Sequence, residues 1–200
     1  MNIAEPWNIV FLITFVIYFG IRHVFIGRTR HEEKVVRQMD RQEKLLLAGM
    51  MPGILLLPLL YLFTPLLDFA DYRLPTAVLT TGVITLFGSL WLFWRSHSDL
   101  GQNWSVSLEL RQQHELITNG VYRRVRHPMY TSIWLWALGQ GMLLQNWLAG
   151  WAVVPAFAAM YFLRTPREEN LMCEKFGDEY RTYMRQTGRL FPRWNASRDK

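Results

Sequence analysis

The sequence lacks the motifs by which most soluble enzymes hold nucleotides or metals. It has no Gly-rich phosphate loop, no Gly-x-Gly-x-x-Gly turn between a strand and a helix, and no Gly-x-Ser-x-Gly elbow. Its five histidines are scattered, so we expect no metal site. Cys173 is the only cysteine, which excludes a disulfide within the chain. Any nucleotide-like cofactor must therefore be held in another way.

The chain also lacks the charge distribution of a nucleic-acid-binding protein, although it is basic. Its formal net charge is +6 and its sequence pI is about 9.7. Half of its residues are hydrophobic, and they fall into long blocks, with the charges gathered between them. Blocks of about 20 apolar residues are typical of membrane-spanning helices. We therefore expect membrane lipids, and no nucleic acid, as the surroundings of this protein.

The apolar blocks predict an all-α fold, a polytopic membrane helix bundle. Three spans are expected at about Trp7–Ile26, Leu45–Phe69 and Leu74–Trp94. The run 128–163 is too long for one straight span, and Gln145 and Asn146 near its middle predict a helical hairpin. The total is about five transmembrane helices, followed by cytosolic C-terminal helices.

The positions of the basic residues predict the orientation. With the N-terminus outside and the C-terminus in the cytosol, only Arg73 of the 22 Lys and Arg residues lies outside. This distribution agrees with the positive-inside rule. The first block lacks the features of a cleaved signal peptide, so we expect it to be retained as a span.

We expect one integral membrane domain, 1–200, in two parts. Residues 1–94 provide three spans, and residues 95–194 form a cofactor-binding and catalytic part that contains the hairpin 128–163. After the hairpin, a cytosolic helix is expected over Glu168–Arg189, broken near Gly177. Aromatic residues on one face of it form either a packing stripe or a lid over a ligand; they are Phe176, Tyr180 and Tyr183.

Two polar clusters flank the hairpin and are the best candidates for chemistry. Pro128 is suited to the first position of a helix, whose free N–H groups attract an anion, with Arg126 and His127 beside it. Glu168 and Glu169 provide carboxylates at an expected helix start, suited to ribose hydroxyls or an ammonium group. The alternative is that these charges only tie the cytosolic ends of the hairpin together.

Several motifs in order resemble the isoprenylcysteine carboxyl methyltransferase family, and in part the related phospholipid methyltransferases. They are Leu100-Gly-Gln-Asn-Trp-Ser105, His114-Glu-Leu-Ile-Thr-Asn-Gly-Val-Tyr122, Val125-Arg-His-Pro-Met-Tyr130, Arg164 with Glu168-Glu169, and Phe176-Gly-Asp-Glu-Tyr180 followed by Tyr183. The resemblance covers about Leu100–Pro192. Prokaryotic members with five spans agree with the N-terminal half, so we expect a prokaryotic inner or cytoplasmic membrane.

The resemblance implies S-adenosylmethionine as cofactor, bound at the cytosolic face. It implies that Arg164 orients an acceptor carboxylate and that Tyr130 belongs to the catalytic site. The implied acceptor is a lipophilic small molecule or prenylated substrate, most simply the carboxylate of an isoprenylcysteine. The implied cofactor contacts are His114, Leu116, Tyr122, Val125, Arg126, His127, Pro128, Tyr130, Glu168 and Glu169.

Other functions stay open at this point. A related methyltransferase could act on a phospholipid amine or a small thiol, for which His127, Tyr130 or a glutamate would remove a proton. A membrane reductase related to sterol reductases would bind a nicotinamide cofactor instead. A non-enzymatic membrane protein would bind no cofactor.

Overall fold

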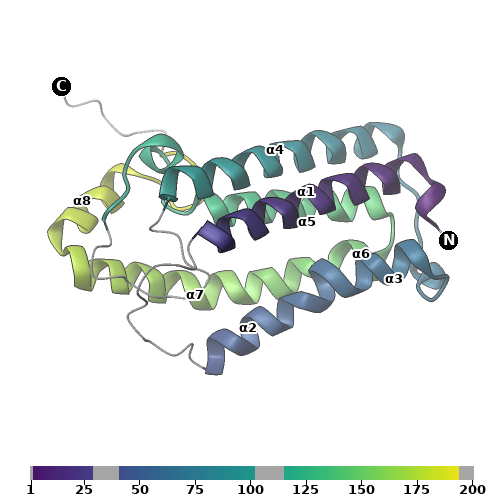
Figure 1. The fold of residues 1–200 in the computed structure, drawn as a ribbon, viewed down its shortest axis with the longest axis horizontal. Coiled ribbons are helices and arrows are strands. Elements are labelled where there is room, and N and C mark those ends of the chain that lie inside the picture. Colours follow the sequence, from purple (N-terminus) through teal and green to yellow (C-terminus); the bar gives the residue numbers. More distant parts are fainter. Residues whose placement is uncertain (1, 29–40, 102–114, 194–200) are drawn as a thin grey trace.

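In the computed structural model, which describes residues 2–28, 41–101 and 115–193, the regular elements of those ranges are helices. Figure 1 shows a bundle of long helices, with the short α8 at one end. The helices are α1 (Pro6–Arg28), α2 (Arg41–Met51), α3 (Leu57–Phe63), α4 (Thr76–Leu100), α5 (Pro128–Leu144), α6 (Trp147–Trp151), α7 (Val153–Phe176) and α8 (Asp178–Gln186). Short 3-10 helices lie at Asn2–Ala4, Asp68–Ala70 and Gly120–Arg123, and a π-helical turn lies at Pro52–Leu56.

Within these described ranges, four helical segments are long and apolar enough to cross a membrane. They cover Pro6–Gly27, Arg41–Phe63, Thr76–Leu100 and Trp147–Phe176. Helix α5 has 17 residues, close to the minimum for a span. It is apolar on all sides and lies between other helices, as expected of a central helix. The all-α membrane bundle is thus confirmed, and the protein is an integral membrane protein.

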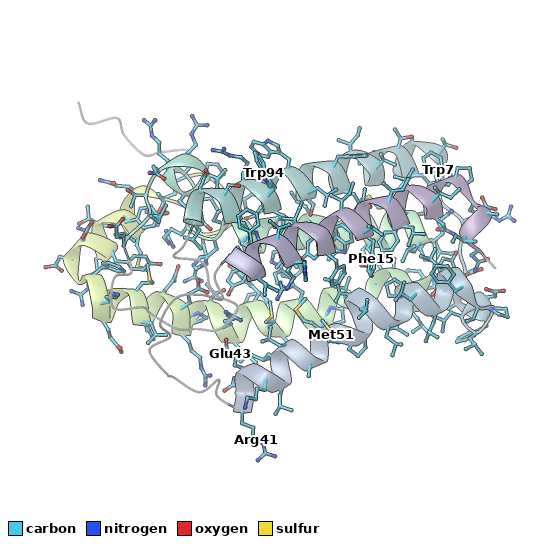
Figure 2. All side chains as sticks on the ribbon, viewed as in Figure 1. Trp7, Phe15, Arg41, Glu43, Met51 and Trp94 are labelled. Atoms are coloured by element: carbon cyan, nitrogen blue, oxygen red, sulfur yellow. The ribbon has the colours of Figure 1, made fainter. Side chains whose placement is uncertain are left out.

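The outer faces of the bundle are apolar, as contact with lipid requires. On α1, Ile13 and Val16 are exposed, and on α4 so are Ile84 and Phe87. Trp7 and Trp94 lie toward opposite ends of the α1–α4 layer in Figure 2. Tryptophan is enriched where the hydrocarbon of a membrane meets water. Inside the bundle, the core is largely aromatic and includes Phe11, Tyr18, Phe93, Trp136 and Phe157.

The second span contains prolines yet remains helical, because a side chain from another helix donates to the backbone carbonyl that lacks a donor within the span. Over Pro52–Leu56 the chain forms π-type bonds, and the Leu57 amide donates to the Pro52 carbonyl. The next such donor would be the amide of Pro58, which has no hydrogen. The carbonyl left without it, that of Gly53, accepts from Nε2 of Gln140 on α5 at 2.8 Å. Neighbouring helices in membranes commonly satisfy such groups.

The predicted hairpin turn is confirmed at Gln145 and Asn146. Gln145 adopts left-handed backbone angles and ends α5, and the Asn146 side chain caps α6 by accepting from two backbone amides. The same Asn146 donates to the Asp71 carboxylate and the Leu67 carbonyl, each at 2.7 Å. The turn is therefore bonded to the connection before α4. The division of function between residues 1–94 and 95–194 stays a prediction, because the core draws on both parts.

Candidate active site

The basic turn before α5 is positioned by the end of α4. Gly120 has a φ of 56°, and a Cβ on it would lie 2.1 Å from a carboxylate oxygen of Asp99. That close approach lets the next amide, on Val121, donate to Asp99 at 2.9 Å. Asp99 also pairs with Arg95 one turn earlier at 2.8 Å. An acidic residue near the end of α4 thus fixes where the turn begins.

Two tyrosines connect this turn to α8 and to α4. The Tyr183 hydroxyl donates to the Tyr122 carbonyl at 2.6 Å, and the Tyr122 hydroxyl donates to the Ser96 carbonyl at 3.3 Å. Burial raises the pKa of Tyr122 and of Tyr183, so both hydroxyls stay protonated as donors. Tyr180 and Tyr183 are buried and Phe176 is half-buried, so the stripe packs against the bundle. Of the two interpretations of the stripe, the structure favours packing.

The segment before α5 pairs with the chain beyond α8, an arrangement that the sequence did not predict. The Arg126 amide donates to the Gly188 carbonyl at 2.8 Å, and the His127 amide donates to the Arg189 carbonyl at 3.0 Å. The Gly188 amide donates back to the Arg124 carbonyl at 3.2 Å, which completes a short parallel bridge. This pairing joins segments far apart in the sequence, and no local pattern announces it.

Helix α5 begins as predicted. Pro128 stands in its first turn, and the first helical bond runs from the Thr131 amide to the His127 carbonyl at 3.1 Å. The amides of Met129 and Tyr130 therefore lie in the open first turn, where a helix has no carbonyl of its own to offer them. Such a turn carries partial positive charge and favours an anionic group.

A buried carboxylate, Glu169, gathers three basic side chains beside that helix start. Nε of Arg126 and Nε2 of His127 each lie 3.2 Å from the same oxygen of Glu169. Arg189 bonds both oxygens, and this bonding raises the pKa of Arg189. Arg126 also donates to the carbonyls of Met184 (3.0 Å) and Thr187. The end of α8 and the residues after it cover the cluster, and the side chains of Arg126 and Glu169 are only 7% and 5% exposed.

The neighbouring carboxylate, Glu168, serves a different side chain. The Tyr130 hydroxyl donates to it at 2.7 Å. The Tyr130 ring stacks on His127, with ring centroids 5.4 Å apart and planes at 15°. Adjacent helical residues point about 100° apart, which explains why the two glutamates do not share one partner. Glu168 and Glu169 thus face two connected sets of groups.

One expectation about this region is wrong. Glu168 and Glu169 do not stand at a helix start, because α7 runs unbroken over Val153–Phe176 and contains Pro166 in its interior. A proline removes one backbone donor, but the surrounding bundle holds the helix together. The break predicted near Gly177 is confirmed there, where α7 ends and α8 begins with a φ of 55° at the glycine. The carboxylates are consequently held on a long, rigid helix.

Arg164 points to a partner that the sequence analysis missed. Its guanidinium lies 3.3 Å from the carboxylate of Glu43 on α2, and the two side chains are 11% and 9% exposed. Glu43 sits in a charged stretch that gave no sign of burial. Only the packing of α2 against α7 shows that it lies inside the protein.

The structure describes some of the other residues that were predicted to contact the cofactor. Val125 lies in the bridge with Gly188, and Leu116 is half-buried in the loop before the basic turn. His114 lies outside the described residues. The structure therefore brings together Arg126, His127, Tyr130, Glu168 and Glu169 at one end of the bundle, with Pro128 opening α5.

These features define a class, a polytopic helical membrane protein with a buried charged cluster at one end of its bundle. Residues 79–174 match the isoprenylcysteine carboxyl methyltransferase (ICMT) family. Over that stretch the chain is similar to this family. It is also similar in fold to a solved structure described as a eukaryotic intramembrane Ras methyltransferase, ICMT, with a TM-score of 0.58 and 20% sequence identity. That similarity covers 96% of this chain and 69% of the other.

Curated relatives match over a shorter stretch. A probable protein-S-isoprenylcysteine O-methyltransferase of Oryza sativa is 37% identical over 78 residues, which are 39% of this chain and 41% of the relative. The Schizosaccharomyces pombe protein-S-isoprenylcysteine O-methyltransferase is 34% identical over 88 residues, or 43% of this chain and 37% of the relative. The chain thus spans about two-fifths of the length of these relatives.

Proposed function

We propose that this protein transfers a methyl group from S-adenosylmethionine to a membrane-embedded lipophilic acceptor, the carboxylate of an isoprenylcysteine-type substrate. The supporting observation is the cluster at the start of α5, where Arg126 and His127 meet Glu169 and Tyr130 meets Glu168. The family and the names of its members support methyl transfer to prenylated cysteine. They give no support to the amine, thiol or reductase alternatives, nor to a non-enzymatic role.

The donor and acceptor groups of the cluster fit this cofactor chemically. The open first turn of α5, with Arg126 beside it, suits the cofactor carboxylate. Glu168 and Glu169 are the acceptors available for an ammonium group and for ribose hydroxyls. The full proposed set is His114, Leu116, Tyr122, Val125, Arg126, His127, Pro128, Tyr130, Glu168 and Glu169. When bound, the cofactor supplies a methyl group on a positively charged sulfur.

The residues of this chain act by binding and alignment. A carboxylate acceptor is ionised at neutral pH, so no residue has to remove a proton from it. Arg164, a permanent cation on α7, would hold that carboxylate without protonating it. Tyr130, fixed between His127 and Glu168, would form one wall of the reaction site. Alignment of the reactants and exclusion of water then provide most of the rate.

The proposed orientation puts the cluster at the cytosolic face, with the N-terminus outside. The basic turn, the end of α7 and α8 lie at the end of the bundle away from the connection between α3 and α4, the connection that contains Arg73. The cofactor would then arrive from the cytosol, while the lipid tail of the acceptor arrives from the membrane. The relatives named above are eukaryotic, so they lend no support to a prokaryotic membrane.

The proposal is tested by labelled methyl transfer with purified protein in detergent and an S-prenylcysteine acceptor. Arg164→Ala removes the cation that would pair with the acceptor carboxylate. Loss of one partner of such a buried pair costs about 2–5 kcal/mol in binding, or a loss of about 30-fold or more in kcat/KM. Arg181→Ala, which removes an exposed arginine paired with Asp178, serves as the control and should retain activity. If Arg164→Ala loses activity equally toward amine, thiol and carboxylate acceptors, the proposed role of Arg164 in holding the carboxylate is wrong.

A further inference from the structure

Glu43 is an acidic side chain in an unusual place. It lies in the first turn of α2, in a segment long and apolar enough to span a membrane, and is 7% exposed. A buried charge is strongly unfavourable unless it is paired. It pairs with the guanidinium of Arg164 across the α2–α7 interface, 3.3 Å away. Figure 2 places Glu43 on the side of α2 toward α7, with Arg41 at the end of the helix.

The surroundings of this pair are chemically suited to bind a lipid that carries a carboxylate. A small hollow between α2 and α7 is lined by Glu43 and Arg164 together with Arg167 and the side chains of Leu46 and Leu163. Leu163 and Leu45 beside it are exposed toward the lipid. The hollow thus combines the buried Glu43–Arg164 pair and a second arginine with apolar walls, at a boundary between two helices. A molecule with a carboxylate head and an aliphatic tail matches that order of groups.

We propose that Glu43 is a positioning residue that holds Arg164 in the place where the acceptor carboxylate binds, and that it gives way to that carboxylate. This inference rests on the proposed function. In the absence of acceptor, the Glu43 carboxylate compensates the buried guanidinium. An incoming carboxylate carries the same charge, so it replaces Glu43 at Arg164 without leaving the cation uncompensated. The displaced Glu43 carboxylate then turns to water at the end of α2, where Arg41 is exposed. A neutral ester product cannot make that replacement, which favours its release.

The test compares the binding of N-acetyl-S-farnesylcysteine with that of its methyl ester. Both are titrated into full-length wild type and Glu43→Gln in detergent, and the ratio of the two affinities is measured. Glu43→Gln removes the competing charge, so the preference for the carboxylate should rise at least fivefold with ester affinity unchanged. In turnover, KM for the carboxylate should fall while kcat is kept. Asp178→Asn, an exposed loss of the same charge, should change neither quantity.

The outcomes separate this inference from the proposed function. If wild type methylates the acceptor and folded Glu43→Gln shows an unchanged ratio, the role of Glu43 is wrong and the proposed function stands. If wild type binds neither probe and transfers no methyl group, the proposed function is wrong and this inference falls with it. Should Glu43→Gln not fold, Glu43→Asp keeps the charge but shortens its reach. A folded Glu43→Asp variant should show a smaller rise in the ratio, and no rise overturns the inference.

Discussion

Glu169 should stabilise the fold far more than one of its partners, Arg189, does. We consider Glu169→Gln, which keeps the size of the side chain and removes its charge. Arg126 and Glu169 are 7% and 5% exposed, and removal of one partner from such a buried pair costs about 3–5 kcal/mol. Arg126 keeps the carbonyls of Met184 and Thr187 as acceptors, so we expect the lower end, about 3 kcal/mol.

Arg189→Ala provides the comparison. The Arg189 side chain is 45% exposed, although it bonds the same carboxylate. Exposed ion pairs contribute up to about 1 kcal/mol, since water already solvates the charge. We therefore expect Arg189→Ala to cost about 1 kcal/mol or less. Burial, and not the number of bonds to Glu169, should set the difference between the two variants.

The assay is reversible unfolding in mixed detergent micelles with increasing sodium dodecyl sulfate, followed by tryptophan fluorescence. The free energies of unfolding of wild type, Glu169→Gln and Arg189→Ala are compared at one micelle composition. The reasoning predicts a loss for Glu169→Gln about threefold that for Arg189→Ala. Equal losses, or a Glu169→Gln variant as stable as wild type, would show that the cluster is not a buried charge network.

Three further variants test the parts that hold the site in place. Gly188→Ala should cost about 1–3 kcal/mol and weaken cofactor binding, because its Cβ would lie 1.6 Å from the Phe191 carbonyl oxygen; unchanged stability and binding would contradict the tail pairing. Gln140→Leu should cost about 1–3 kcal/mol by leaving the Gly53 carbonyl without its donor, measured by the same unfolding assay. Asn146→Ala removes a helix cap and the donor to the Leu67 carbonyl, so it should cost about 2–4 kcal/mol, with thermal melting as the measurement.

Local patterns were enough to predict most of the helices and some of their ends, although the second span ends at Phe63 and not at Phe69, because Thr64 before Pro65 is extended. Apolar blocks of span length predicted the bundle, Gln145 and Asn146 predicted the hairpin turn, and Gly177 predicted the break before α8. Each of these signals lies within a few residues of the structure it specifies. The position of Pro128 in the first turn of α5 follows in the same way, because a proline needs no backbone donor there.

Contacts between distant segments were beyond the sequence. The bridge between Val125 and Gly188 joins two polar loops, and polar loops carry no periodicity that would reveal a partner. Glu43 looked like one charge among several in a solvated segment, because its burial depends on α2 packing against α7. Pro166 suggested a helix end where α7 in fact continues, because a proline that would break a helix in solution is tolerated inside a membrane bundle.

The sequence predicted which polar residues lie together, whereas their assignment to a binding site stays a prediction. The structure does bring together Arg126, His127, Tyr130 and the two glutamates. The alternative expectation, an ion pair that links the two ends of the hairpin, also holds, because Arg126 bonds Glu169. A structural tie and the proposed binding site are compatible here. Glu169 holds the turn in place, and its neighbour Glu168 accepts only from Tyr130 among the bonds described, beside the open helix start.

The measurement that tests the central proposal most directly is calorimetric titration of S-adenosylhomocysteine, the product form of the cofactor, into detergent-purified protein. Wild type should bind it. Glu168→Ala should bind at least tenfold more weakly while remaining folded, and Asp178→Asn should bind like wild type. A well-folded wild-type protein that shows no binding would contradict the methyltransferase proposal. Reduced nicotinamide cofactors would then be titrated in its place.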